Sequence, residues 1–209
     1  PPHPGSDWTR FVCISDTHSR RYPVPPGDVL LHSGDLSLYG SFSALHKTIA
    51  WLQTLPHPLK IIIAGNHDLC LDPDWTQNTL GYDEDSQKTG SAQALVRDLA
   101  VREAGIQYLE HESYQFTSVS GKQWNVYGSP AAPRYSDGAF QYATDQEADE
   151  IYSNIPLDTE ILLTHTPPYR TLDKTRKGKH AGCRRLAAHM SQLNACRLHV
   201  FGHIHEGHG

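Results

Sequence analysis

The stretch Leu59-Lys60-Ile61-Ile62-Ile63-Ala64 runs directly into Gly65-Asn66-His67-Asp68. The apolar run is typical of a buried strand, and the glycine is typical of the turn that ends it. The turn then carries an amide that can bind a metal, an imidazole that can move a proton and a carboxylate that can orient the imidazole. Taken alone, the same four residues also fit an ordinary polar surface turn, so the rest of the chain has to decide.

The composition indicates one globular domain over residues 1–209, with enough chain to bury a core. The formal net charge of -5 argues against a general nucleic-acid binder. The four cysteines have no C-x-x-C spacing, so we expect buried thiols, including Cys13, and no oxidising compartment. The sequence contains no apolar span long enough to predict a membrane helix, and we expect a cytoplasmic protein.

The sequence predicts strands and helices that alternate in the first third of the chain. Residues 11–14, 29–32 and 59–64 are short apolar runs that we interpret as buried strands. Apolar residues from Phe42 to Leu52 recur at helical spacing, with Ser41 or Ser43 as N-cap. This order favours an α/β fold with parallel strands and helices on the faces of the sheet.

The remaining elements are predicted by the same patterns. Residues 69–90 form a polar, irregular loop, and a helix follows from Ala92 to Leu99. Three strands around Gln107, 114–117 and 123–127 look like hairpin material with a turn at Ser120-Gly121. The sequence then predicts a helix opened by a Thr144–Glu147 capping box, a strand over 161–163, a helix over 183–193 and a strand over 198–201.

Potential metal ligands follow each of five predicted strands. In chain order they are Asp16 and His18, Asp35, Asn66 with His67, His165, and His203 with His205. Each group alone has an ordinary explanation as a helix cap, a turn or a satisfied histidine. The carboxyl ends of parallel strands meet at one crevice, so the groups are expected to converge. Oxygen and imidazole ligands in this number predict two divalent ions sharing one carboxylate, of Mn, Fe, Zn or Mg type.

These motifs resemble the full signature of the calcineurin-like metallophosphoesterase superfamily. The matching motifs are Asp16-x-His18, Gly34-Asp35, Gly65-Asn66-His67-Asp68, Thr164-His165 and Gly202-His203-x-His205. Within it, the Thr-His-x-Pro-Pro and Tyr127-Gly-Ser-Pro130 stretches are similar to the metallophosphoesterase-domain-containing group, the class III phosphodiesterases. The resemblance implies a four-layer αββα sandwich.

The resemblance also implies a role for each motif residue. One ion would be held by Asp16, His18, Asp35 and His205, and the other by Asp35, Asn66, His165 and His203. His67 would contact the scissile phosphate and serve as general acid, and Asp68 would hold its imidazole in position. Mn²⁺ is the favoured metal.

The chain departs from the family pattern at two places. Protein phosphatases of the superfamily have an aspartate three residues after Asp35, where this chain has Leu38. The family also continues beyond the Gly-His-x-His motif with strands that complete one sheet, whereas this sequence stops at Gly209. Either this chain is a C-terminally incomplete piece of the domain or the protein lacks that edge, and in both cases we expect an uncovered sheet that favours self-association or low stability.

The expected function is hydrolysis of small phosphate diesters, including cyclic nucleotides, by a hydroxide held between the two ions. A phosphomonoesterase or nucleotidase with the same centre is the first alternative. A metal-binding scaffold with little activity is the second, and the intact ligand set speaks against it. The oligomeric state is left open.

Substrate choice is expected to come from the loops. Arg170, Lys174 and Arg176 form a basic run that would clamp a second phosphate or a nucleotide, or else be a solvated loop. Trp75 and Tyr135 would stack a base, or else pack on their own loops.

Overall fold

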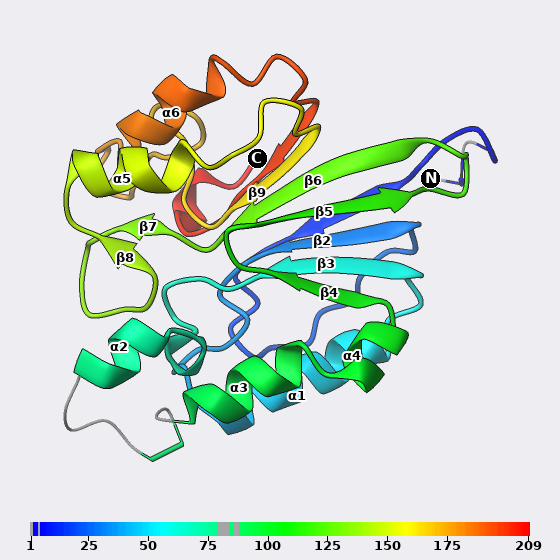
Figure 1. The fold of residues 1–209 in the computed structure, drawn as a ribbon, viewed down its shortest axis with the longest axis horizontal. Helices are drawn as coiled ribbons and strands as arrows, with labels where there is room; N and C mark the ends of the chain where they lie inside the picture. The colour runs from blue at the N-terminus through cyan, green and yellow to red at the C-terminus, as the bar shows by residue number, and fades with distance from the viewer. Residues whose placement is uncertain (1, 4, 79–83, 86–87) are drawn as a thin grey trace.

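Two four-stranded sheets are stacked face to face in the computed structural model, which describes residues 2–3, 5–78, 84–85 and 88–209 (Figure 1). The first sheet has the order β1-β2-β3-β4, and all its strands are parallel. Its strands are β1 (Phe11–Ile14), β2 (Val29–Ser33), β3 (Leu59–Ile63) and β4 (Ile106–Leu109).

The second sheet has the order β10-β9-β6-β5, and only β5 runs antiparallel to its neighbour. Its strands are β5 (Glu112–Thr117), β6 (Gln123–Ser129), β9 (Ile161–Thr164) and β10 (Leu198–Val200). A short ribbon of β7 (Ala132–Pro133) and β8 (Gln141–Tyr142) lies beside it.

Alternation of side chains along the strands divides the core into layers. In β3, Ile61 and Ile63 point between the sheets and pack with Val126 and Leu163 of the second sheet. Ile62 points to the opposite face, toward the helices. The apolar run that follows Leu59 is therefore buried on both faces, as expected for a parallel strand inside a sandwich.

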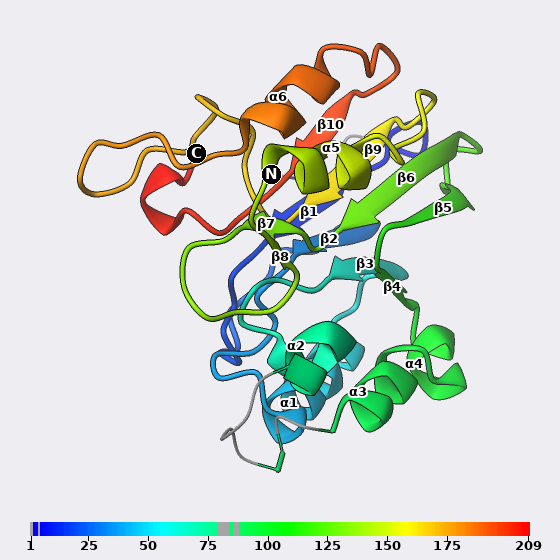
Figure 2. The same ribbon diagram turned by 60° about the vertical axis from the view of Figure 1, so that its left-hand side comes forward.

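Helices cover the outer face of each sheet (Figure 2). The first sheet is covered by α1 (Phe42–Gln53), α3 (Thr89–Val96) and α4 (Leu99–Glu103). The second is covered by α5 (Asp145–Tyr152) and α6 (Arg184–Met190). The four-layer αββα sandwich implied by the motifs is confirmed. No helix in the described ranges has the length and apolar character needed to cross a membrane.

Several local signals of the sequence have the expected structure. Ser41 is the N-cap of α1 and accepts from the Ala44 amide, and Thr144 with Glu147 forms a complete capping box at α5. The β5–β6 hairpin turns at Gly121, which has a φ of 80°.

The strand around Gln107 was wrongly predicted as hairpin material. It is β4, which pairs in parallel with β3 and joins the first sheet. The crossover from β3 through α3 and α4 returns the chain to the same sheet edge, where Ile106 and Tyr108 face the helices. A short apolar run is equally compatible with pairing to β3 and with pairing to the hairpin strand β5, which explains the error.

The helix predicted from Ala92 to Leu99 is divided in two. Asp98 accepts a hydrogen bond from the Ala100 amide and so begins α4 as a new helix. The helix predicted to Leu193 ends at Met190 instead.

The loop predicted over 69–90 is partly helical. It contains η1 (Leu69–Leu71) and α2 (Pro73–Asn78), because Asp72 accepts from the amides of Asp74 and Trp75. Residues 79–83 and 86–87 of that predicted loop lie outside the described residues. The thiol prediction holds for Cys70 and Cys183, which are buried, but is wrong for Cys13, which is exposed on edge strand β1.

A groove of about 1020 Å³ runs along the open edges of β1 and β10. We call it the edge groove, and its apolar lining includes Ile14, Val24, Leu172, Met190 and Phe201. Among the described residues, β1 and β10 each pair with a strand on one side only.

Candidate metal centre

Turns at the carboxyl ends of five strands bring all seven predicted ligands to one place between the sheets. The turns after β1, β2 and β3 carry Asp16, His18, Asp35 and Asn66, and the turns after β9 and β10 carry His165, His203 and His205. Ligand atoms lie within 4.8 Å of one another in the overlapping groups Asp16–His18–His205, His18–Asp35–His67 and Asp16–Asp35–His165.

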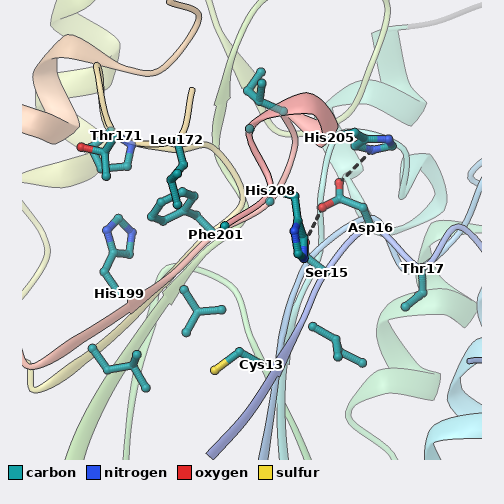
Figure 3. Close-up of a pocket in the computed structure, with 18 of the residues that line it drawn as sticks. Cys13, Ser15, Asp16, Thr17, Thr171, Leu172, His199, Phe201, His205 and His208 are labelled. Atoms are coloured by element: carbon teal, nitrogen blue, oxygen red, sulfur yellow. Dashed lines mark hydrogen bonds and ion pairs between the residues drawn. The ribbon is translucent and has the colours of Figure 1, made fainter. Parts of the chain in front are cut away.

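One half of the centre is formed by Asp16, His18 and His205. The Nε2 atoms of the two histidines lie 3.3 Å apart, and His205 Nε2 lies 3.4 Å from Asp16 Oδ1. Figure 3 shows Asp16 and His205 at the end of the edge groove, with Ser15 donating to the same carboxylate. This half is therefore open to the groove.

The other half is formed around His165, which is fully buried. Its Nε2 atom lies 2.9 Å from Asn66 Oδ1 and 3.4 Å from Asp35 Oδ1. The ring of His203 packs against the His165 ring, with centroids 4.9 Å apart. The second oxygen of Asp35 lies 3.6 Å from His18 Nε2, so each oxygen of this carboxylate faces a different half.

These distances and atom types fit two divalent ions. Two ligands of one ion, each bonded at about 2.0–2.2 Å and at right angles, lie about 3 Å apart. Carboxylate, amide and imidazole atoms approach one another here at 2.9 to 3.6 Å without a thiolate. The Nδ1 atom of His165 is tied to the Ser33 carbonyl at 3.0 Å, which directs Nε2 into the centre.

Backbone conformation at the ligands is unusual. Asp16, His18, Asp35 and His203 have φ values of 50°, 46°, 53° and 69°. Residues other than glycine adopt this left-handed region rarely and at a cost of about 1–3 kcal/mol, and such residues cluster at functional sites. The turns are thus shaped to direct these four side chains inward.

Glycines make room for the carboxylates. A Cβ atom on Gly65 would overlap Asp35 Oδ1, and one on Gly202 would overlap Asp16 Oδ2. The glycines of the Gly-Asn-His-Asp and Gly-His-x-His motifs therefore let the turn after one strand approach a ligand from another.

The pKa values of Asp16 and His203 are shifted toward the forms that bind a metal, whereas that of His165 is raised, because the effect of its burial, which lowers it, is outweighed by the charges of Asp35 and Asp16. Burial alone would raise the pKa of Asp16, but a hydrogen bond from His205 and the nearby His165 lower it overall. Burial is the main reason that the pKa of His203 is lowered to about 3, and the charge of His165 is the second. An ionised carboxylate and a neutral imidazole are the forms that bind a metal.

Asp68 was predicted to hold the His67 ring in position, but its carboxylate makes no direct hydrogen bond to that ring. The His67 Nδ1 atom lies 2.7 Å from the carbonyl oxygen of Leu38, and the Asp68 carboxylate accepts instead from Gly65, Leu36 and Ser37. Burial, and next the charge of Asp35, raise the pKa of Asp68 to about 6. The His67 ring stands edge-on to His18, with centroids 4.7 Å apart.

The predicted basic residues Arg170, Lys174 and Arg176 are exposed on the loop after β9. Arg176 Nε lies 3.8 Å from Glu206 Oε1, and Glu206 directly follows His205. The loop therefore packs beside the turn that carries one ligand.

The aromatic residues predicted to stack a base differ in exposure. Trp75 is only 8% exposed, so its ring is not presented to a ligand. Tyr135 is 88% exposed. Base stacking by Trp75 is thus excluded by burial.

Sequence reasoning missed the two carbonyl groups that orient histidines, those of Ser33 and Leu38. It also missed Asp173, a buried carboxylate that accepts from the Arg170 and Gly182 amides and pairs with His180. Any residue supplies a carbonyl, so no signal could have found the first two. An acidic residue inside a basic run was a signal for the third.

Comparisons with known proteins agree with this geometry. A model of the calcineurin-like phosphoesterase family matches residues 9–207. The chain is 36% identical over 221 residues to human metallophosphoesterase domain-containing protein 1, covering all of this chain and 64% of that protein. It is 38% identical over 201 residues to probable rhamnogalacturonate lyase C of Emericella nidulans, covering 96% of this chain.

The chain spans 17% of the lyase and 64% of the human protein, less than two thirds of either relative. The solved structure of TT1561 from Thermus thermophilus superposes with a TM-score of 0.55 at 13% identity, covering 91% of this chain and 80% of that one. At this identity the likeness concerns the fold alone.

Proposed function

The chain belongs to the calcineurin-like phosphoesterase family, and from this premise we propose that it is a metal-dependent phosphodiesterase acting on small phosphate esters. Cyclic nucleotides and nucleotides are the substrates we favour, and the cytoplasm is the location, in keeping with four free cysteines. The observation that carries the proposal is Asp35, whose two oxygens face separate groups of ligands.

The proposed metal ligands are the seven residues described above, with Asp35 shared between two ions and Mn²⁺ as the preferred metal. When bound, two divalent ions supply a water of lowered pKa and neutralise charge on the phosphate. Hard oxygen and imidazole donors suit Mn²⁺, Fe, Zn²⁺ and Mg²⁺.

Residues of the chain supply the other parts of the reaction. His67 stands beside His18 at the edge of the centre, within reach of a phosphate bound there, and donates a proton to the leaving oxygen. Its Nδ1 atom is occupied by the Leu38 carbonyl, which leaves Nε2 for the substrate. No covalent intermediate is needed.

Arg170, Lys174 and Arg176 are proposed to bind a second negative group of the substrate. Their loop lies against the turn after His205, through Arg176 and Glu206. Replacing all three by Ala should raise KM for multiply charged esters more than for singly charged ones, because only the former lose an ion pair. An equal effect on both would indicate a solvated loop.

Hydrolysis of bis-p-nitrophenyl phosphate and p-nitrophenyl phosphate, after chelation and Mn²⁺ addition, tests the proposal. Metal-restored cleavage that favours the diester is the expected result. A preference for the monoester would assign the same centre to a phosphomonoesterase, and no cleavage with two ions bound would favour a scaffold. The Asp35→Asn variant, purified in parallel, controls for a contaminating phosphatase.

A further inference from the structure

Asp68 directly follows His67, the proposed general acid, but its carboxylate accepts hydrogen bonds mainly from another segment, residues 36–37. The side chain is fully buried. Oδ2 accepts from the amides of Leu36 at 3.0 Å and Gly65 at 2.9 Å. Oδ1 accepts from the amide of Ser37 at 2.7 Å and from its hydroxyl at 2.8 Å. Three of these four donors belong to the turn after β2, so the carboxylate joins that turn to the turn after β3.

The segment that Asp68 binds, Leu36 and Ser37, leads directly into Leu38, the hydrogen-bond partner of the His67 ring. Directly after Ser37 comes Leu38, whose carbonyl oxygen lies 2.7 Å from His67 Nδ1. The Ser37 hydroxyl also donates to the His67 carbonyl at 3.2 Å, and the His67 amide donates to Asp35 Oδ1 at 2.9 Å. Both the ring and the backbone of His67 are therefore tied to residues 35–38.

The Leu38 contact determines the tautomer of His67. A carbonyl oxygen can only accept, so Nδ1 must carry the hydrogen in this bond. The neutral ring then has its lone pair on Nε2, and the protonated ring has its transferable proton there. When the ring gives the Nε2 proton to a leaving oxygen, that oxygen keeps the electron pair of the broken P–O bond. The ring is left in the tautomer that Leu38 binds.

We propose that Asp68 is a positioning residue that acts through Ser37 and the Leu38 carbonyl to hold His67 with Nε2 toward the phosphate. Leu38 stands where the related protein phosphatases have a carboxylate, and its backbone takes over the orienting contact. The inference deepens the proposed function and rests on it, because it assigns how the general acid is oriented.

Ser37→Ala is the mild variant that tests this role, since it removes only the hydroxyl that Asp68 Oδ1 and the His67 carbonyl share and keeps the carboxylate. Assays use the Mn²⁺-loaded chain with two aryl diesters, one with p-nitrophenolate and one with phenolate as leaving group. We expect kcat to fall about fivefold for phenolate, the effect of one hydrogen bond, and less for p-nitrophenolate, which needs little protonation. KM should stay unchanged.

The same substitution in the His67→Ala background separates positioning from a structural effect. Without the imidazole, Ser37→Ala should lower kcat no further. An equal loss in both backgrounds would overturn the proposal. Ser118→Ala is the matched control, because Ser118 is also buried and bonded to a backbone carbonyl, that of Lys122, on the β5–β6 turn. It should leave both kcat values unchanged.

Nitrogen NMR of the Zn²⁺-loaded chain with ¹⁵N-labelled histidine tests the tautomer without an assay. Signals of His67 are those lost in His67→Gln. At a pH high enough to give the neutral ring, we expect hydrogen on Nδ1 in the parent chain and a mixture of tautomers in Asp68→Asn. Hydrogen on Nε2 in the parent chain would overturn the inference. A chain that shows the expected tautomer but cleaves no ester would refute the proposed function alone.

Discussion

At the scale of single residues, His67 and Asp35 separate proton transfer from metal binding. His67→Ala should lower kcat by about 10²–10⁴-fold, the usual contribution of a general acid, and leave the metal content of two ions unchanged. Asp35→Asn should lose metal, because each of its oxygens faces one half of the centre. Metal analysis beside the diester assay checks both. Equal metal loss in the two variants would contradict the role given to His67.

His199 predicts a pH dependence of stability. His199 is half-buried beside the edge groove, and its partial loss of solvent lowers its pKa from 6.5 to about 3; its Nε2 atom lies 2.8 Å from Thr164 Oγ1. Below pH 6.5 the unfolded chain therefore binds a proton that the folded chain does not. Folding stability is full above that pH and falls as the pH drops toward 3, by at most about 1.4 kcal/mol per pH unit from this group.

Urea unfolding between pH 4 and 7 measures this effect. His199→Gln, which keeps a donor for Thr164, should flatten the dependence, and His46→Gln, at an exposed position on α1, should not. Parallel curves for the parent chain and His199→Gln would rule out His199 as the source.

The side chains of the centre were easier to predict than the groups that orient them. Asp16, Asp35 and His165 each follow a strand within two residues, so strand order alone predicted that they would converge. Their roles as ligands remain predictions. The orientation of His67 by Leu38 was not predictable, because a backbone carbonyl leaves no trace in the sequence. We predicted that the Asp68 carboxylate holds the neighbouring imidazole, whereas in its buried position it accepts hydrogen bonds from backbone amides.

At the scale of elements, Asp173 organises the basic loop. Its carboxylate is 1% exposed, and it accepts from the Arg170 and Gly182 amides and from His180. Asp173→Ala should leave those donors unpaired and loosen the loop. Trypsin should then cut after Arg170, Lys174 or Lys179 several-fold faster, with the fragments identified by mass spectrometry.

Asp158→Ala is the control for this experiment, because Asp158 lies in the turn before β9, whereas the basic loop follows the other end of that strand. Cleavage of the basic loop at the same rate in the parent chain, Asp158→Ala and Asp173→Ala would mean that Asp173 does not restrain it.

Helix boundaries were predicted correctly where contacts within one turn determine them. Thr144 and Glu147 define the start of α5 through contacts within one turn. The pairing of β4 with β3 instead of β5 depends on where α3 and α4 return the chain, which is a property of the packed molecule. The split at Asp98 has a local signal, an N-cap residue inside an apolar pattern, that was overlooked.

At the scale of the whole molecule, the edge groove predicts self-association of the 209-residue chain. Apolar side chains and unpaired strand edges favour contact with another chain. Met190→Lys introduces a charge at the end of α6, inside the groove, and should reduce the concentration-dependent rise in sedimentation coefficient. Leu157→Lys, at a position 64% exposed outside the groove, is the control. The same rise in all three chains would exclude the groove as the contact.

The centre also joins the two sheets. Asp16 and Asp35 come from the first sheet, and His165 and His205 from the second, so the proposed ions crosslink the sandwich through its middle. Ions that bind only the folded chain stabilise it by mass action. Mn²⁺ at 100 times its dissociation constant should add about 2.7 kcal/mol per ion, and one ion should raise Tm by about 5–10 °C for a chain of this size.

Calorimetry with Mn²⁺ and with a chelator measures that shift. Because the crosslink removes a route by which the sheets separate, Mn²⁺ should also slow hydrogen exchange in β2 and β9, whose contact spans both sheets. Asp35→Asn should show neither effect, whereas His67→Ala should show both. A Tm that rises equally in Asp35→Asn would mean that the metal acts elsewhere on the surface, and the centre would lose its role in holding the sheets together.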